Sequence, residues 1–140
     1  MKFLLIISLS LLSLNMKAQV NPVTDTLAYL QTVIANKAQF IGQPFSKLSD
    51  SLRIQIKFFS PSGDIPYDRR KETSTRFGFC FPAIADEIYL TYPSVRVIWQ
   101  SPLNAVQSDI IYDNNNGGGW NATSSAFYST GIIRDIQLVE

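Results

Sequence analysis

The sequence predicts an α+β fold in which two N-terminal helices pack on one face of a four- to five-stranded, mostly antiparallel sheet. Apolar residues recur at helical spacing between residues 25 and 51 and alternate at period two in several later segments. Prolines and glycines separate these segments at short intervals. Because helices come first and strands follow, the helices are expected to cover one face of the sheet.

The first 18 residues have the three parts of a secretory signal peptide. Lys2 gives a positive start, residues 3–14 form an apolar run interrupted only by serines, and a more polar end closes on Ala18. This run is shorter than the about 20 residues that span a bilayer. We therefore expect residues 1–18 to be removed and residues 19–140 to form a single α+β domain.

The expected location is the periplasm or the outside of a bacterial cell. A bacterial lipoprotein needs a cysteine at the cleavage point, but the only cysteine is Cys80, so a lipid anchor is not expected. Cleavage after Ala18 also removes Lys2 and Lys17, which leaves ten basic and 11 acidic residues and a net charge of −1. A near-neutral chain lacks the positive charge that favours nucleic acid or an anionic membrane. No later run is apolar enough to span a membrane.

Two helices are expected before the sheet. Residues 25–36 carry apolar side chains at helical spacing, and the side-chain oxygen of Thr24 or Asp25 can cap this helix. Residues 44–51 form the second helix, which starts at Pro44 after a turn at Gly42.

Residues 94–100 are predicted to be an inner strand, with Trp99 as its largest core side chain. The other expected strands cover residues 53–59, 73–81, about 88–92, and 131–139, the last at an edge. A helical turn or short helix is expected around residues 104–108. Residues 113–119 are the least ordered stretch by composition, since they consist of Asp, Asn and Gly only.

One segment, Phe40-Ile41-Gly42-Gln43-Pro44-Phe45-Ser46-Lys47-Leu48, resembles small secreted domains like the β-lactamase inhibitor protein. In that family, a helix, a glycine-bearing turn and a second helix pack on a four-stranded antiparallel sheet. The resemblance covers about residues 25–100 and implies this architecture, with a binding or envelope-assembly role rather than catalysis. The long turn at residues 60–72 and the loop before Trp120 depart from the family's pattern. The chain also resembles small secreted proteins of envelope-rich bacteria.

Missing residue types exclude several kinds of chemistry. The chain has no histidine, which excludes a Ser-His-Asp triad, a Cys-His pair and histidine ligation of a metal. One cysteine cannot bind zinc alone or form an internal disulfide. No Gly-rich phosphate loop is present. We therefore expect no enzyme activity, no metal and no cofactor.

The remaining reactive side chains have simpler explanations. Cys80 lies in a phenylalanine-rich strand, so a buried, inert thiol is expected rather than a nucleophile. A carboxylate-based hydrolase would need Asp64, Asp68, Asp86 and Glu87 to line one cleft. All four occur in polar turns, where solvated surface positions are expected.

The segment from Tyr112 to Trp120 offers a second kind of site. Asp113 and the asparagines after it resemble the start of a calcium loop, but the twelfth position is Ser124 instead of glutamate, which favours a flexible turn. Exposed aromatic rings beside Asn and Asp could stack on a sugar or contact a protein. The alternative is that Trp120 folds back onto the core.

Arg69 and Arg70, with Lys71, form a basic tip that could contact an acidic partner, or a solvated turn flanked by Asp68 and Glu72. Together these observations predict a secreted, non-catalytic interaction domain that binds a protein or envelope component, with an inhibitor or immunity-like role among the possibilities. The alternatives are a small-molecule or glycan binder that uses residues 112–120, and the carboxylate-based hydrolase. The candidate binding residues are Tyr112, Asp113, Trp120, Arg69 and Arg70.

Overall fold

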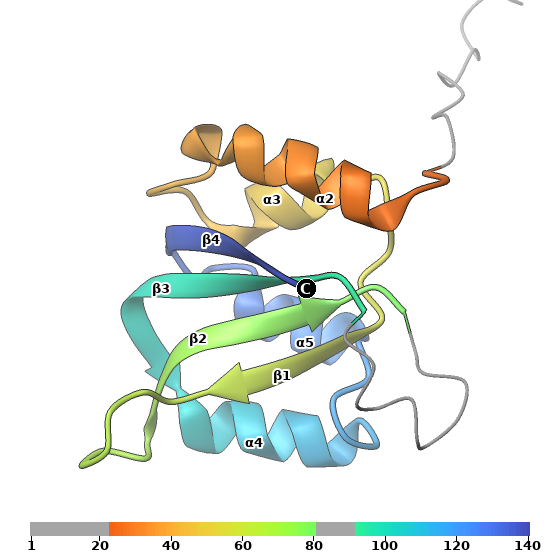
Figure 1. Ribbon diagram of the computed structural model, residues 1–140. Coiled ribbons are helices and arrows are strands. Elements are labelled where there is room, and N and C mark those ends of the chain that lie inside the picture. Colours follow the sequence, from red (N-terminus) through yellow and green to blue (C-terminus); the bar gives the residue numbers. More distant parts are fainter. Residues whose placement is uncertain (1–22, 81–91) are drawn as a thin grey trace, which may run out of the picture.

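The computed structural model describes residues 23–80 and 92–140 of the chain. They form an α+β fold with four α-helices and one antiparallel sheet in the order β1-β2-β3-β4 (Figure 1). The predicted α+β class and the antiparallel sheet are confirmed, whereas the predicted packing of the two N-terminal helices on one face of the sheet is not. The described residues contain four strands and no fifth one, and most of the strand expected at residues 88–92 lies outside them.

The first described helix, α2, spans Thr26–Ala35 and agrees with the prediction. Asp25 caps it, because its side-chain oxygen accepts a hydrogen bond of 3.0 Å from the backbone N–H of Ala28. Leu30 is the fully buried residue of this helix. A short 3-10 helix, η1, follows at Lys37–Gln39.

Helix α3 spans Phe45–Ser51, also as predicted. The chain turns at Gly42, whose φ of 74° lies in the left-handed region that favours glycine. Pro44 then occupies the N-cap position. Phe45 and Leu48, at helical spacing, are both buried against the sheet.

Strands β1 (Phe58–Ser62) and β2 (Lys71–Gly78) form the first hairpin. The prediction of a strand over residues 53–59 was wrong in its bounds. The last residue of β2, Gly78, pairs with Phe58, so residues before Phe58 have no further β2 partner. Pro61 is tolerated because β1 is an edge strand.

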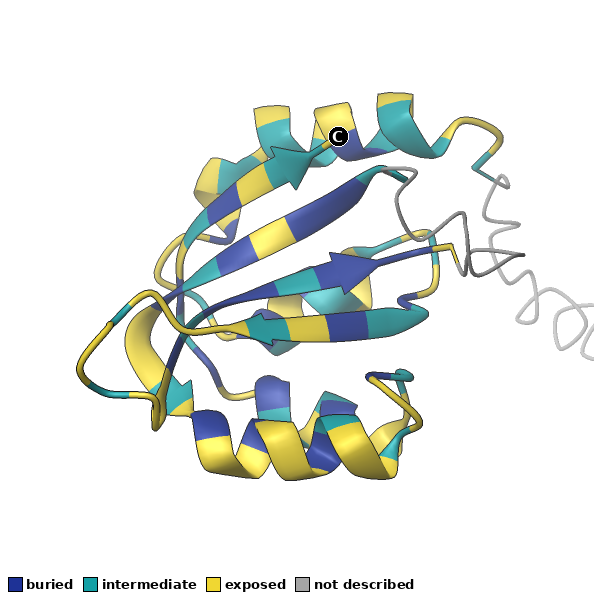
Figure 2. Cartoon of the chain, turned by 60° about the horizontal axis from the view of Figure 1, so that its bottom comes forward, coloured by how far each residue is buried: buried dark blue, intermediate teal, exposed yellow. Residues whose placement is uncertain are grey.

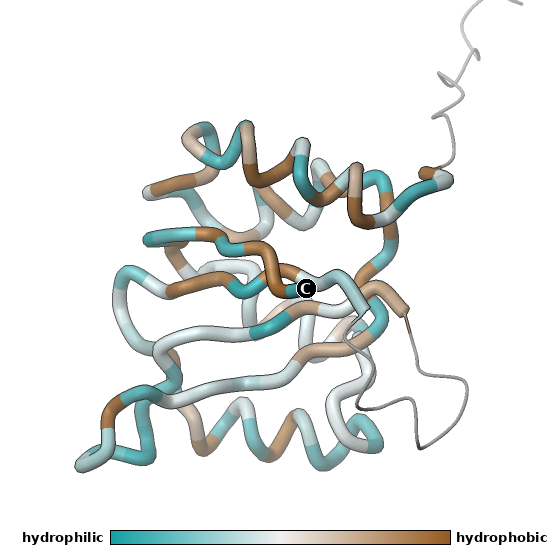
Figure 3. Tube along the Cα trace, in the orientation of Figure 1, coloured by the Kyte–Doolittle hydropathy of each residue, from teal (hydrophilic) through white to brown (hydrophobic). Residues whose placement is uncertain are grey.

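Strand β3 spans Ser94–Asn104, and β4 spans Ile133–Val139 at the other edge of the sheet. The central position of β3 and the edge position of β4 confirm the prediction. β3 continues beyond Gln100 because, after a register shift, Glu72 pairs with Leu103. Along β3 and β4, hydrophobic and hydrophilic residues alternate (Figure 3).

Two helices connect β3 to β4. Helix α4 (Ala105–Asn114) is longer than the turn or short helix expected there, and it includes residues that were predicted to be the least ordered. Helix α5 (Ala122–Tyr128) was not predicted, although Asn121 and Ser124 form a capping box at its start. None of the helices in the described parts of the chain is long and apolar enough to cross a membrane.

The helices lie behind the sheet and along its two edges in the view of Figure 1, so one face of the sheet has no described helix over it. Phe77 lies on the covered face, where its ring stacks on Phe45 at 4.5 Å between centroids and contacts Trp99 edge-on at 6.4 Å. Tyr128 of α5 stacks on Trp99 at 5.8 Å. The core is therefore an aromatic cluster between α3, α5 and the sheet.

Candidate functional site

Trp120, a predicted binding residue, packs toward the core. Its ring contacts Phe77 at 5.6 Å, Phe59 at 6.1 Å and Tyr128 at 6.1 Å between centroids. The side chain is partly buried, as expected if the loop folds back onto the core. The ring that a sugar would stack on is thus packed against other aromatic rings of the core.

The rest of the loop also supports the sheet. The ring of Tyr112 meets Phe59 edge-on at 5.8 Å, and its backbone carbonyl accepts hydrogen bonds from Gly117 and Gly118. Gly118 has a φ of 95°, and a Cβ there would lie 2.3 Å from the carbonyl oxygen of Phe59. Asp113 is exposed on the last turn of α4. Residues 112–120 are thus packed and hydrogen-bonded beside β1 as part of the fold.

The predicted basic tip lies elsewhere. Arg69 and Arg70 are exposed in the turn between β1 and β2, and Arg70 lies 3.6 Å from Asp68. The carbonyl oxygen of Arg70 accepts a hydrogen bond from the backbone N–H of Ala105, at the start of α4, whereas Tyr112 and Asp113 lie in the last turn of α4 and Trp120 follows it. The fold therefore holds the two groups of predicted binding residues at opposite ends of α4 and does not join them into one site (Figure 1).

The proposed carboxylate cleft is not assembled among the described residues. Asp64 accepts a hydrogen bond from the Thr73 hydroxyl at 3.1 Å. The pKa of Asp68 is lowered, mainly because the backbone N–H of Arg70 donates to it. Asp86 and Glu87 lie outside the described residues. Residues 23–80 and 92–140 also contain no group of three acidic, Cys or His side chains placed to hold a metal.

Cys80 is exposed, so the prediction of a buried thiol was wrong. Cys80 lies after the end of β2. Phe77 and Phe79 are buried in the core, but Cys80 is not packed against it. The sequence pattern extended the predicted strand to residue 81, three residues beyond the end of β2 at Gly78.

Glu72 is an acidic residue whose burial differs from the prediction. It was expected at a solvated tip, but only 1% of its surface is exposed. Its carboxylate accepts hydrogen bonds from the hydroxyl of Tyr128 at 3.0 Å and from the hydroxyl of Thr75. The indole N–H of Trp99 donates to Thr75 Oγ1 at 2.9 Å and completes a buried network. The partner Tyr128 lies 56 residues away in the sequence, so no local pattern could have shown this burial.

This carboxyl has no basic partner among the described ion pairs, which join Lys37 to Asp135 and Arg70 and Lys71 to Asp68. Desolvation raises the pKa of Glu72, and hydrogen bonds from Ser108, Thr75 and Tyr128 oppose the shift. Burial and the charge of Glu72 likewise raise the pKa of Tyr128, which keeps its hydroxyl a donor. Raised pKa values are typical of catalytic acids, but this carboxyl is only 1% exposed and its hydrogen-bond partners are core residues. We interpret the network as structural.

A shallow groove between α4 and α5 offers no catalytic group. Its lining contains only uncharged side chains, namely Gln107, Ile111, Ala122, Thr123, Ala126 and Phe127.

The largest candidate site is the face of the sheet that the described helices leave free. Its side chains form three rows across the four strands. We call this surface the open face and define it by Phe58, Gly78, Ser94 and Val139 in the first row, Ser60, Arg76, Arg96 and Gln137 in the second, and Ser62, Ser74, Ile98 and Asp135 in the third. The strands carry exposed, partly buried and buried residues (Figure 2), and on the open face Ser60, Ser62, Arg96 and Gln137 are exposed, whereas Ser74, Gly78 and Ser94 are buried.

Two arginines lie at the centre of the open face. Arg76 of β2 and Arg96 of β3 are directly opposite each other in the strand register. The Nε of Arg76 donates a hydrogen bond of 2.6 Å to the hydroxyl of Ser94, which fixes its guanidinium. Neither arginine takes part in the ion pairs of the described residues. Like charges directly opposite in a sheet destabilise it, so this pair is not explained by stability.

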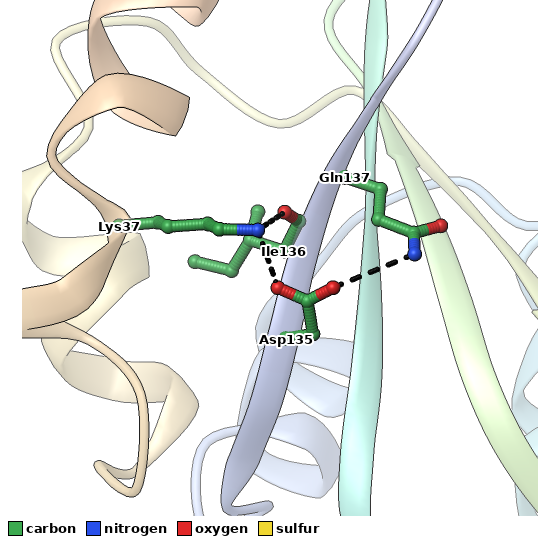
Figure 4. A network of polar contacts seen from close by, with 4 residues as sticks. All are labelled: Lys37, Asp135, Ile136 and Gln137. Carbon is green, nitrogen blue, oxygen red and sulfur yellow. Dashed lines mark hydrogen bonds and ion pairs between the residues drawn. The ribbon is translucent and has the colours of Figure 1, made fainter.

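The one acidic residue of the open face is already neutralised. Asp135 accepts a hydrogen bond of 2.6 Å from Lys37 Nζ, which also donates to the carbonyl oxygen of Ile136 (Figure 4). This contact holds the pKa of Asp135 below its usual range. The open face therefore presents a net positive centre formed by Arg76 and Arg96.

The edges of the sheet are less available than this face. Beside β1, Phe59 donates a backbone hydrogen bond to Gly118 and Trp120 donates one to Lys57. Beside β4, Ile133 donates to the carbonyl oxygen of Gln43, and Lys37 contacts the strand further along. Protected edges disfavour binding by addition of a strand.

Comparison of the chain with protein-family models, with curated proteins and with solved structures gave no match. The function is therefore argued from the site alone.

Proposed function

We propose that this protein is a secreted, non-catalytic interaction domain that binds a protein or envelope component in the bacterial envelope or outside the cell. The signal-peptide pattern of residues 1–18 supports export. An inhibitor or immunity-like role is one form of this proposal.

The observation that carries the proposal is the arginine pair on the open face. A cross-strand pair of like charges lowers stability by about 0.2–1 kcal/mol relative to neutral residues. Arg76 and Arg96 nevertheless lie opposite each other without an acidic partner among the described ion pairs. A partner that supplies negative charge would offset this cost and explain why both guanidinium groups lie on one surface. Arginine is also enriched at protein interfaces.

The rest of the molecule supports binding over catalysis. The buried acid Glu72 is used in a network inside the core. The groove between α4 and α5 lacks titratable groups. A face formed by four paired strands suits a macromolecular partner better than a small ligand, since small ligands prefer concave sites.

The test uses the mature chain from Gln19 and two tryptophan variants as bait for envelope extract from the source organism. Gln137→Trp adds bulk to the open face, whereas Gln107→Trp adds the same bulk to the exposed side of α4. We expect the wild-type chain and Gln107→Trp to retain one envelope component, and this binding should saturate. The Gln137→Trp variant should not retain that component. No specific component on any bait would contradict the proposed function.

A further inference from the structure

We infer that the open face binds an acidic α-helix of a partner protein, with two carboxylates three or four residues apart set against Arg76 and Arg96. This inference rests on the proposed function and names the chemistry of the partner. Four kinds of observation support it: the charge of the face, the spacing of the arginines, the protected edges of the sheet, and the side chains around the pair.

The charge of the face selects an acidic occupant. Among the ion pairs of residues 23–80 and 92–140, none involves Arg76 or Arg96, and Asp135 of the same face is paired with Lys37. A second copy of this chain would place its own arginines on the same face, and the like charges would repel. An anionic membrane would require a larger basic cluster, of about four to eight Lys or Arg.

The spacing favours a helix. Residues directly opposite in an antiparallel sheet have Cα atoms about 4.5–5.5 Å apart. Acidic residues three or four positions apart on a helix have Cβ atoms about 5–6 Å apart and point to the same side. A helix can thus present one carboxylate to each guanidinium. Arginine and carboxylate form two parallel hydrogen bonds when their planes align.

Binding of an extended partner strand at an edge of the sheet is less accessible than binding to the open face. Both edges carry backbone or side-chain contacts from this chain, at Gly118 and Trp120 beside β1 and at Gln43 and Lys37 beside β4. An extended partner strand would have to displace these contacts. Sheet faces, in contrast, are commonly covered by helices.

The side chains around the arginines add apolar contact. Ile98 is half-buried in the row next to Arg96. Phe58 lies in the row on the other side, and its ring covers Gly78, where a Cβ would lie 2.0 Å from the ring carbon Cε1 of Phe58. A helix laid across the face would meet apolar surface on both sides of the charged row.

The experiment measures fluorescence anisotropy of two labelled, Ala-rich helical peptides of equal length and equal charge. In the first peptide, two glutamates are four residues apart and share one side of the helix. In the second they are two residues apart and point away from each other. We expect the first peptide to bind the wild-type mature chain about tenfold more tightly than the second.

Two protein variants show which arginines cause the preference for the first peptide. Arg76→Gln with Arg96→Gln removes both charges from the open face, and Arg69→Gln with Arg70→Gln removes two charges from the exposed β1–β2 turn. The preference for the first peptide should disappear in the first variant and persist in the second. The single change Arg96→Gln, at an exposed residue, should weaken the preference severalfold if the double variant folds poorly.

Four outcomes would overturn the inference. Equal binding of the two peptides to the wild-type chain would show that the spacing is not recognised. An unchanged preference in Arg76→Gln with Arg96→Gln would place the site elsewhere. Arginine-dependent binding to phosphatidylglycerol vesicles without peptide binding would make the occupant a lipid surface. If the envelope component is still lost with Gln137→Trp but not with the arginine variant, the proposed function stands and this inference fails.

Discussion

The two faces of this sheet are built from alternate residues of the same strands, yet they have different tasks. On one face, Phe59, Phe77 and Val95 form a buried row against the helices. One residue further along, the open face carries Arg76 and Arg96 at its centre. Because a strand directs successive side chains to opposite faces, stability and recognition can be assigned to alternate positions.

Whether a substitution alters stability or binding therefore depends on which face of the sheet its position in the strand occupies. Changes on the covered face should lower stability, and changes on the open face should alter binding with little effect on stability. Substitutions on the two faces test this separation, and the largest effect on stability is expected on the covered face.

The largest effect is expected for Phe77→Ala. Phe77 is fully buried and contacts Phe45, Trp99, Trp120 and Tyr128. Its removal should lower the free energy of unfolding by about 3–5 kcal/mol in urea titrations, because a cavity remains in the aromatic core. A loss of less than 1 kcal/mol would show that this face does not hold the fold together.

Trp120→Ala should have the next largest effect, a loss of about 2–3 kcal/mol, since this partly buried ring packs on the same cluster. Asp113→Ala, at an exposed residue of the same region, serves as the control and should change stability by less than about 0.5 kcal/mol. Unchanged stability of Trp120→Ala, together with loss of glycan binding, would instead favour the hypothesis of a ligand site at residues 112–120.

The buried acid gives a pH-dependent effect on the covered face. The pKa of Glu72 is raised by desolvation, so the folded protein prefers the protonated carboxyl. The stability from this group is fully present below its unfolded pKa, near the ordinary value of 4.5, and is lost as pH rises through the folded pKa. The free energy of unfolding of the wild-type chain should therefore fall relative to Glu72→Gln as pH increases from about 4.

Parallel titrations by urea denaturation at several pH values measure this difference. Asp113→Asn, which changes an exposed carboxyl in the same way, is measured in parallel as the control. A difference between wild type and Glu72→Gln that grows in the opposite direction would mean that the folded state stabilises the charged carboxylate.

The smallest effect is expected on the open face. Arg96 is exposed and lies opposite Arg76, so Arg96→Gln removes a like-charge contact. The change should raise the free energy of unfolding by a few tenths of a kcal/mol or leave it unchanged. High salt should reduce the difference from the wild-type chain, because salt screens exposed charges.

The elements that the sequence predicted are those with local signals. Helix α2 has its cap at Asp25, and α3 has Gly42 and Pro44 ahead of apolar residues at helical spacing. Trp99 was correctly expected as core because the β3 pattern surrounds it with β-branched residues. Local physics determines these features, so one sequence is enough to find them.

Helix α5 was missed despite its local capping box, but three other missed features depend on distant partners. The start of β1 is determined by where β2 ends, at Gly78, rather than by the alternation before Phe58. Glu72 is buried because Tyr128 approaches it from α5. The arginine pair was invisible for the same reason, since Arg76 and Arg96 become neighbours only through the register of β2 and β3.

The most direct test of the separation between the two faces compares stability and binding in one variant. Arg76→Gln with Arg96→Gln is measured both by urea denaturation and by anisotropy with the peptide whose glutamates are four residues apart. We predict a free energy of unfolding within about 0.5 kcal/mol of the wild type, together with about a tenfold loss of affinity. A large loss of stability, or unchanged affinity, would contradict the assignment of recognition to the open face.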